Sequence, residues 1–231
     1  KSGKTGGTSM EIALSKFTSD SDIVTRIWSD EEEAMRGNLG ITNKNAGFLY
    51  NHSTPALLLA FLKTPQYRDR DIFNSYFKFT IIREPVDLFI SKYFFEKNSR
   101  DPKLTPCDIN DWVNILKERR ETKKNVGDEN WEICTLNGKL AVDDYIHYSK
   151  YSGPGSKMYK DCTRISEKLN FPENLADVFY NSRAKTEYRT RDKVVLNKES
   201  LDFIEEVSKR EREITGMKLA REEYGKRTAL I

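Results

Sequence analysis

KSGKTGGTS, at residues 1–9, runs directly into MEIALSKF, whose apolar spacing predicts an amphipathic helix over residues 8–18. Backbone N–H groups at a helix start lack intrahelical partners, and the helix dipole adds positive charge there, so the loop suits a phosphate or sulfate. Gly6 and Gly7 allow close approach to an anion, and Lys4 adds a mobile charge. Hydroxyl donors come from Thr5, Thr8 and Ser9. The stretch therefore predicts an anion site of the type that binds nucleotides.

Length and charge balance narrow the classes of protein. With 231 residues, the chain can bury a substantial core as one domain, or at most form two small domains. Its 39 basic and 36 acidic residues nearly cancel, so no nucleic-acid partner is expected. No apolar run has membrane-spanning length, and no signal peptide is evident. The wide spacing of Cys107, Cys134 and Cys162 argues against a disulfide scaffold and a CxxC zinc site, although one disulfide stays possible.

Alternating strand and helix patterns predict an α/β fold, a P-loop-like three-layer domain with a central, mainly parallel sheet flanked by helices. The whole of residues 1–231 is expected to form this single domain. A loop of this kind normally follows a buried strand, so a native strand upstream of residue 1 is expected. The expected strand covers residues 77–82, and the expected helices cover 55–62, 85–97, 108–121, 157–169 and 199–215, with another starting near Leu140 and including residues 142–146.

A second informative stretch is FTIIREPVDLFISKY, at residues 79–93. Its strand ends at Arg83, and a proline-started helix follows that carries Ser91. An arginine at the carboxyl end of a strand lies on the ligand edge of an open α/β sheet. The guanidinium group fits a phosphate bidentately, and a serine hydroxyl can add a hydrogen bond. The alternative for Arg83 is an ordinary surface ion pair with Glu84 or Asp87.

Together, KTGGTS before a helix and a strand ending R-[DE]-P, with a serine eight positions after the arginine, resemble the sulfotransferases that use 3′-phosphoadenosine 5′-phosphosulfate (PAPS). The branch most similar contains the Golgi carbohydrate sulfotransferases and their bacterial relatives. The resemblance implies that PAPS is the donor and leaves as the bisphosphate PAP. Arg83 and Ser91 would hold the 3′-phosphate, and the 5′-phosphosulfate would lie on the loop residues Lys4, Thr5, Gly6, Gly7, Thr8 and Ser9.

Later segments extend the resemblance. NHSTPALL, at residues 51–58, is similar to a histidine-containing segment of the family, and residues 142–169 are similar to a later one. A basic loop follows where the family closes over the nucleotide, and Tyr188 and Arg189 are the expected nucleotide contacts there. The loop could equally face an anionic acceptor or be a solvated surface. Its basic and aromatic residues are Tyr180, Arg183, Lys185, Tyr188, Arg189, Arg191 and Lys193.

Two residues are predicted to be catalytic. His52 is the candidate general base, because a histidine titrates in the range needed to take a hydroxyl proton. Lys4 would stabilise charge on the leaving phosphate, an effect of about 3 kcal/mol for one preorganised donor. The other histidine, His147, is expected to be structural. No metal is expected, because no cluster of His, Cys and Asp has ligand spacing.

Two other functions compete with sulfuryl transfer. Gly3, Lys4 and Thr5 imitate the end of a Walker A motif, which would indicate a kinase or NTPase. Two glycines follow, however, and the strand ends in Arg83 where a Walker B strand would end in Asp. A non-catalytic anion-binding module is the second alternative. The expected acceptor is a carbohydrate or a small molecule, and the compartment is the cytoplasm for a bacterial protein or the Golgi lumen for a eukaryotic domain.

Overall fold

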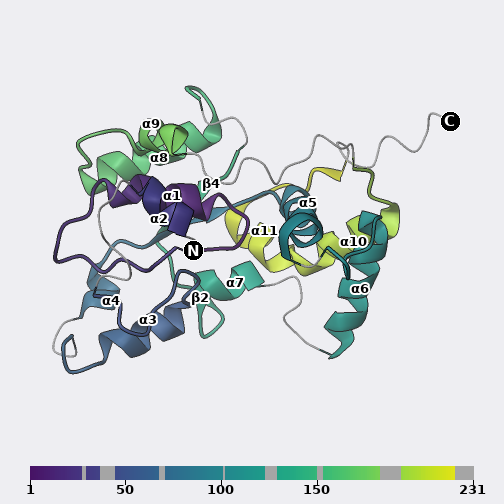
Figure 1. Ribbon diagram of the computed structural model, residues 1–231, viewed down its shortest axis with the longest axis horizontal. Coiled ribbons are helices and arrows are strands. Elements are labelled where there is room, and N and C mark those ends of the chain that lie inside the picture. The colour runs from purple at the N-terminus through teal and green to yellow at the C-terminus, as the bar shows by residue number, and fades with distance from the viewer. Residues whose placement is uncertain are drawn as a thin grey trace. The chain divides into compact units, whose positions relative to one another are not determined.

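The structure is a computed structural model, which describes residues 1–27, 30–36, 45–67, 71–100, 102–122, 129–149, 153–182 and 194–221 (Figure 1). The chain divides into two compact units. The first combines Lys1–Ile82 with Glu132–Ala184, and the second combines Arg83–Trp131 with Lys185–Ile231. Among the described residues, the first unit contains two hydrophobic clusters and the second contains one, each formed by residues of that unit.

A parallel pair of strands forms the core of the first unit. Strand β1 (Phe79–Ile82) pairs with β4 (Asp144–His147), and Ile82 lies opposite His147 at the carboxyl end. The expected strand at residues 77–82 is confirmed as β1. The helix expected to include residues 142–146 is wrong, because this segment contributes to β4. Ile146 is fully buried between two less buried neighbours, and this period of two is that of a strand.

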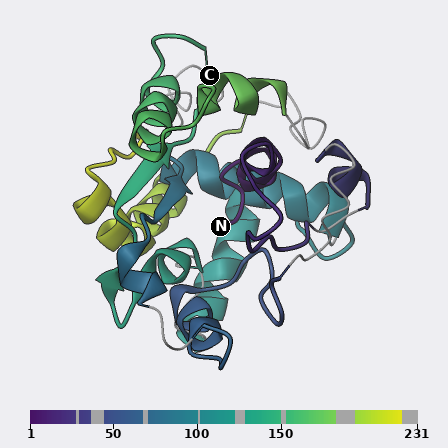
Figure 2. The same ribbon diagram turned by 90° about the vertical axis from the view of Figure 1, so that its left-hand side faces the viewer.

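Three helices share one apolar cluster with the two strands. The ribbons of these elements are drawn in Figures 1 and 2. The helices are α1 (Gly7–Ser15), α8 (Lys157–Leu169) and α9 (Leu175–Asn181). Helix α8 matches its predicted bounds because both ends carry local signals. The Ser156 hydroxyl accepts the Tyr159 N–H at 3.0 Å, and Asn170 ends the helix in the left-handed conformation. The buried members of the cluster are Met10, Ala13, Ile81, Ile146, Met158, Cys162, Ile165, Leu175, Ala176, Val178 and Phe179.

The rest of the first unit consists of short elements. Helix α3 (Pro55–Leu62) has its predicted bounds, with Thr54 as N-cap and proline in the first turn. The sequence did not predict the hairpin, in which Asn137 and Gly138, both with positive φ, join β2 (Thr135–Leu136) to β3 (Lys139–Leu140). Two further helices are α2 (Asp30–Met35) and α4 (Ile72–Ser75).

The described part of the second unit is helical. Helix α5 (Pro85–Phe95) continues into a π-helical turn, η1 (Glu96–Arg100), and α6 (Ile109–Thr122) follows. The helix expected over residues 199–215 is two helices, α10 (Lys198–Val207) and α11 (Lys209–Thr215), because Ser208 leaves helical geometry. Edge-to-face rings of Phe89, Trp112 and Phe203 anchor the core. Helix α7 (Glu129–Cys134) crosses the boundary between the units.

The described residues thus form a mixed structure of helices and strands with a small parallel sheet, which confirms the α/β prediction at that level. Within those same residues, no helix has both the length and the apolar character needed to cross a bilayer.

Candidate functional site

The opening loop contacts β1 and leads into helix α1. The Ser2 hydroxyl donates to the Ile81 carbonyl oxygen at 2.5 Å, and the Thr5 hydroxyl donates to the Ser2 carbonyl oxygen at 3.1 Å. Lys4 and Gly6 have left-handed backbone, with φ of 60° and 77°. Helix α1 begins at Gly7, and its N-cap position makes no side-chain capping bond. N–H groups in the first turn of a helix point toward its N-terminus, so this helix start suits an anion.

Both loop glycines make room for neighbouring side chains. A Cβ at Gly6 would lie 2.7 Å from Cε2 of Tyr148, which directly follows β4. A Cβ at Gly7 would lie 2.7 Å from Cδ of Lys1. Gly6 also needs its positive φ, which side chains strain. The sequence predicted that the two glycines allow an anion to approach the loop closely. The structure shows that the side chains of Tyr148 and Lys1 also pack against them.

The loop hydroxyls differ in their surroundings. Thr5 is 1% exposed and bonded to Ser2, so its side chain holds the loop together. Ser9 is buried as well. The Thr8 hydroxyl accepts from the Lys1 ammonium at 3.4 Å, and Lys4 is half-buried. The six loop residues lie together as the sequence expected, while contact of each with an anion stays a prediction.

His52 is tied to this loop by a backbone contact. Its Nδ1 lies 2.9 Å from the Lys1 carbonyl oxygen. A carbonyl oxygen can only accept, so Nδ1 carries the proton and the lone pair of the neutral ring is on Nε2. The turn that carries His52 is closed by the Ser53 N–H, which donates to the Tyr50 carbonyl oxygen at 2.9 Å. The backbone thus sets both the orientation and the tautomer of the ring.

The surroundings of His52 also favour its neutral form. Burial lowers the pKa of His52 below its ordinary value, although the hydrogen bond to the Lys1 carbonyl acts in the opposite direction. The positive charge of Lys1 lowers this pKa further. The ring is therefore neutral at neutral pH, and its Nε2 can accept a proton, as a general base must.

The second unit carries the other predicted contacts. Arg83 directly follows β1, and its Nε donates to Asp87 Oδ2 at 2.6 Å with both side chains largely buried. The ion pair with Asp87 that the sequence offered as an alternative is thus present, but it is buried and does not lie at the surface. Glu84 is the N-cap of α5 and accepts the N–H groups of Asp87 and Ala220 at 2.7 and 3.0 Å. Burial raises the pKa of Glu84, against these hydrogen bonds.

Ser91 lies two turns into α5, the helix that Arg83 precedes, and is half-buried. The helix thus places both residues on the second unit, whereas the loop and His52 belong to the first. A common site for all four stays a prediction. Tyr188 and Arg189, the expected contacts of the basic loop, lie outside the described residues.

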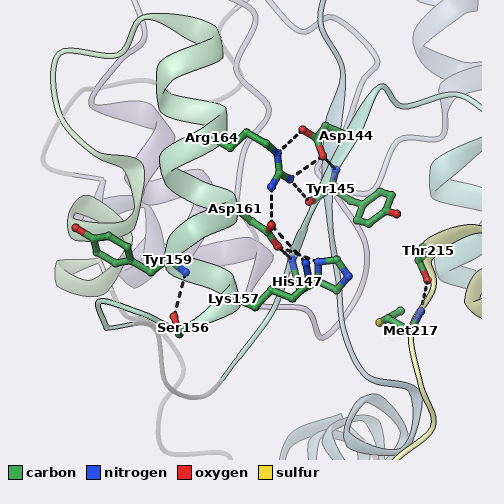
Figure 3. Close-up of polar contacts among 10 residues, drawn as sticks. All are labelled: Asp144, Tyr145, His147, Ser156, Lys157, Tyr159, Asp161, Arg164, Thr215 and Met217. Carbon is green, nitrogen blue, oxygen red and sulfur yellow. Dashed lines mark hydrogen bonds and ion pairs between the residues drawn. The ribbon is translucent and has the colours of Figure 1, made fainter.

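His147 belongs to a polar network at one edge of β4 (Figure 3). Asp161 on α8 accepts the His147 backbone N–H at 3.0 Å and lies 2.8 Å from its Nδ1. Arg164 holds Asp144 with two N–H groups and donates to the Tyr145 carbonyl oxygen at 3.2 Å. The Tyr145 carbonyl and the His147 N–H lie two residues apart and are on the same edge of β4. Side chains of α8 therefore provide the hydrogen-bond partners that a neighbouring strand would provide at this edge.

Asp161 is the centre of that network. Burial alone would raise its pKa, but hydrogen bonds from His147 and Arg164 outweigh burial and hold the pKa well below the ordinary range. The hydrogen bonds that Arg164 donates to Asp144 and Asp161 stabilise its charged form, so they raise the pKa of Arg164. These contacts join β4 to α8 and support the structural role that the sequence favoured for His147.

The cysteines of the described residues form no disulfide. They are Cys107, which is exposed, and Cys134 and Cys162, which are buried. Burial raises the pKa of Cys162 to about 12, so its thiol is protonated and unreactive at neutral pH. No group of three or more His, Cys, Asp and Glu side chains in the described ranges is arranged to hold a metal ion.

Comparison with known proteins identifies the family. A sequence model of the sulfotransferase family matches residues 8–215, which is most of the chain. The chain belongs to the sulfotransferase family. No curated protein and no solved structure gives a significant match. The sulfotransferase match includes His52, Arg83 and Ser91 and begins within the opening loop, at Thr8.

Two residues of this sulfotransferase were not predicted to belong to the site. Lys1 contacts His52 through its carbonyl oxygen and Thr8 through its ammonium group. Tyr148 covers Gly6 with its ring. Neither has a local sequence signal, because the contacts of Lys1 with His52 and of Tyr148 with Gly6 join segments far apart in the chain. The paired glycines were the one hint that bulky neighbours approach the loop.

Proposed function

We propose that this sulfotransferase transfers the sulfuryl group of PAPS to an acceptor hydroxyl, on a glycan or a small-molecule natural product, by in-line attack. The proposal includes a P-loop-like, three-layer α/β domain of the branch that contains the carbohydrate sulfotransferases. One observation carries it within this family: the candidate base His52 is hydrogen-bonded to the opening loop, with its Nε2 lone pair available. The loop supplies an anion site and the histidine supplies a proton acceptor beside it.

The loop fits the 5′-phosphosulfate by the chemistry of its donors. Helix α1 starts at Gly7 with the dipole that favours an anion, and Lys4 and Thr8 add side-chain donors. Lys4 would stabilise negative charge on the leaving phosphate oxygen. A preorganised donor of this kind is worth about 3 kcal/mol of barrier. Contacts from Thr5, Gly6, Gly7 and Ser9 would then come mainly from the backbone.

Arg83 and Ser91 would select the 3′-phosphate. The Arg83 guanidinium is oriented by Asp87, and a fixed fork of N–H donors suits a phosphate. Ser91 would donate its hydroxyl from the same helical segment. Tyr188 and Arg189 would close over the nucleotide from the basic loop.

His52 would act on the acceptor. When bound, PAPS supplies the sulfuryl group. Nε2 of His52 would take the proton of the acceptor hydroxyl while that oxygen forms its bond to sulfur, the bond from sulfur to the 5′-phosphate oxygen breaks, and PAP leaves. Nδ1 would keep its hydrogen bond to Lys1. The imidazolium that results is stabilised by the carbonyl it donates to. The lowered pKa of His52 ensures that the base is unprotonated before the reaction starts.

Two measurements test the proposal. PAP, in the absence of Mg²⁺, should raise the melting temperature, and ATP with Mg²⁺ should have little effect. The protein should also transfer ³⁵S-sulfate from PAPS to members of glycan or small-molecule acceptor pools. Stabilisation by ATP with Mg²⁺ but not by PAP would replace the proposal with a kinase or NTPase. Tight PAP binding without transfer to any pool would leave a non-catalytic module.

A further inference from the structure

Lys1 lies between the candidate base and the helix start. Its carbonyl oxygen accepts from His52, and its side chain crosses Gly7 to reach α1. There the ammonium group pairs with Glu11 and lies 3.4 Å from the Thr8 hydroxyl. A second cation besides Lys4 is thus fixed at the first turn of α1, where an anion on the helix N-terminus would bind.

The partner of this cation is a carboxylate from one turn further along the same helix. The Lys1 and Glu11 side chains are only 14% and 18% exposed, so the pair is largely removed from water. Burial raises the pKa of Glu11, and the charge of Lys1 opposes that rise. The buried negative charge of Glu11 is therefore energetically unfavourable apart from its pairing with Lys1. An anionic ligand at the helix N-terminus would compete with Glu11 for the same ammonium group.

We propose that Lys1 is a second cationic contact for the 5′-phosphosulfate of the donor, and that Glu11 holds the Lys1 ammonium beside the loop until the donor binds. The inference rests on the proposed function, since it assigns a further residue to the same donor site. Glu11 acts through Lys1 and is a positioning residue. A bound phosphate oxygen shares the ammonium with the carboxylate or takes it over.

The test compares two ligands that differ only in the 5′-phosphate. Isothermal titration calorimetry measures the binding of PAP and of adenosine 3′-phosphate to the wild-type chain and to Lys1→Met and Glu11→Gln. Methionine keeps an apolar side chain over Gly7 and removes the charge. Lys16→Met is the matched control, because it removes a lysine charge from the exposed far end of α1. Lys1→Arg tests rescue by a retained charge.

We expect Lys1→Met to weaken PAP binding about tenfold and to leave adenosine 3′-phosphate binding within about twofold, as for loss of one charged hydrogen bond. Lys1→Arg should recover most of the PAP affinity, and Lys16→Met should change neither ligand. Glu11→Gln should tighten PAP binding, because a neutral amide no longer competes for the ammonium group.

Three results would overturn the inference. Equal losses for both ligands in Lys1→Met would show that the side chain only supports the fold of the loop, and no loss for either would show that it does not contact the donor. Weaker PAP binding in Glu11→Gln would show that the ion pair is purely structural. A wild-type chain that binds neither ligand would refute the proposed function itself, which separates the two failures.

Discussion

Replacing His52 with asparagine separates its chemistry from its structural contact. In His52→Asn, the side-chain amide can still donate to the Lys1 carbonyl oxygen, which His52 Nδ1 reaches at 2.9 Å, but it cannot accept a proton at catalytic pH. Because burial lowers the pKa of His52 below its ordinary 6.5, more than about three quarters of the rings are neutral at pH 7. His52→Asn should therefore remove nearly the whole contribution of the general base to kcat. We expect kcat to fall about 10²- to 10⁴-fold, or about 3–5 kcal/mol of barrier.

The assay is initial-rate transfer of ³⁵S-sulfate from PAPS, measured from pH 5 to 8. In the wild type, kcat/KM should rise with pH as His52 loses its proton, with the midpoint below 6.5 because the folded pKa is lowered. The asparagine variant should lack this acid limb, and its PAP affinity should stay within about twofold. A variant that keeps more than a tenth of the wild-type kcat, or the same acid limb, would refute the assignment of the base.

Two further predictions concern stability. Gly6→Ala should cost about 2–4 kcal/mol in the free energy of unfolding, because it combines a positive φ with a Cβ 2.7 Å from the Tyr148 ring. Gly138→Ala is its control, with φ of +73° and open space, and should cost only about 1 kcal/mol; equal costs would contradict the packing argument. Asp161→Asn should lower the free energy of unfolding by about 2–3 kcal/mol at pH 7. This loss is smaller than for a fully buried ion pair because Arg164 is half-exposed. The pKa of Asp161 is lowered by folding, so this stability is present above the unfolded pKa of about 3.9 and is lost as pH falls through the folded pKa. Urea denaturation at pH 7 and pH 3 checks both the cost and its decline, and a cost independent of pH would count against the network.

Local signals explain why several helices could be predicted from the sequence. Thr54 and a following proline mark the start of α3, while Ser156 and Asn170 mark the two ends of α8. The loop before α1 also has a local signature in its glycines, lysine and hydroxyls. The extent of the loop is therefore evident from the sequence, whereas the contact of its residues with an anion stays a prediction.

Long-range contacts explain most of what could not be predicted. Strand β4 reads as a helix when taken alone, and its extended state depends on pairing with β1 and on the side chains of α8. The contacts of Lys1 with His52, and of Tyr148 with Gly6, join distant segments that no pattern links. The break between α10 and α11 has a local cause. The Ser208 hydroxyl bonds the Ile204 carbonyl oxygen at 2.7 Å, a competition with the helix that the apolar pattern does not reveal.

The central claim is that the opening loop and Arg83 bind opposite ends of one nucleotide. Calorimetric titration of PAP, adenosine 5′-phosphate and adenosine 3′-phosphate into the wild type, Lys4→Met and Arg83→Met tests it directly. We expect Lys4→Met to reduce the preference for PAP over adenosine 3′-phosphate, and Arg83→Met to reduce the preference for PAP over adenosine 5′-phosphate. If each variant leaves its own preference intact, or if the wild type shows none, the two groups do not share a ligand.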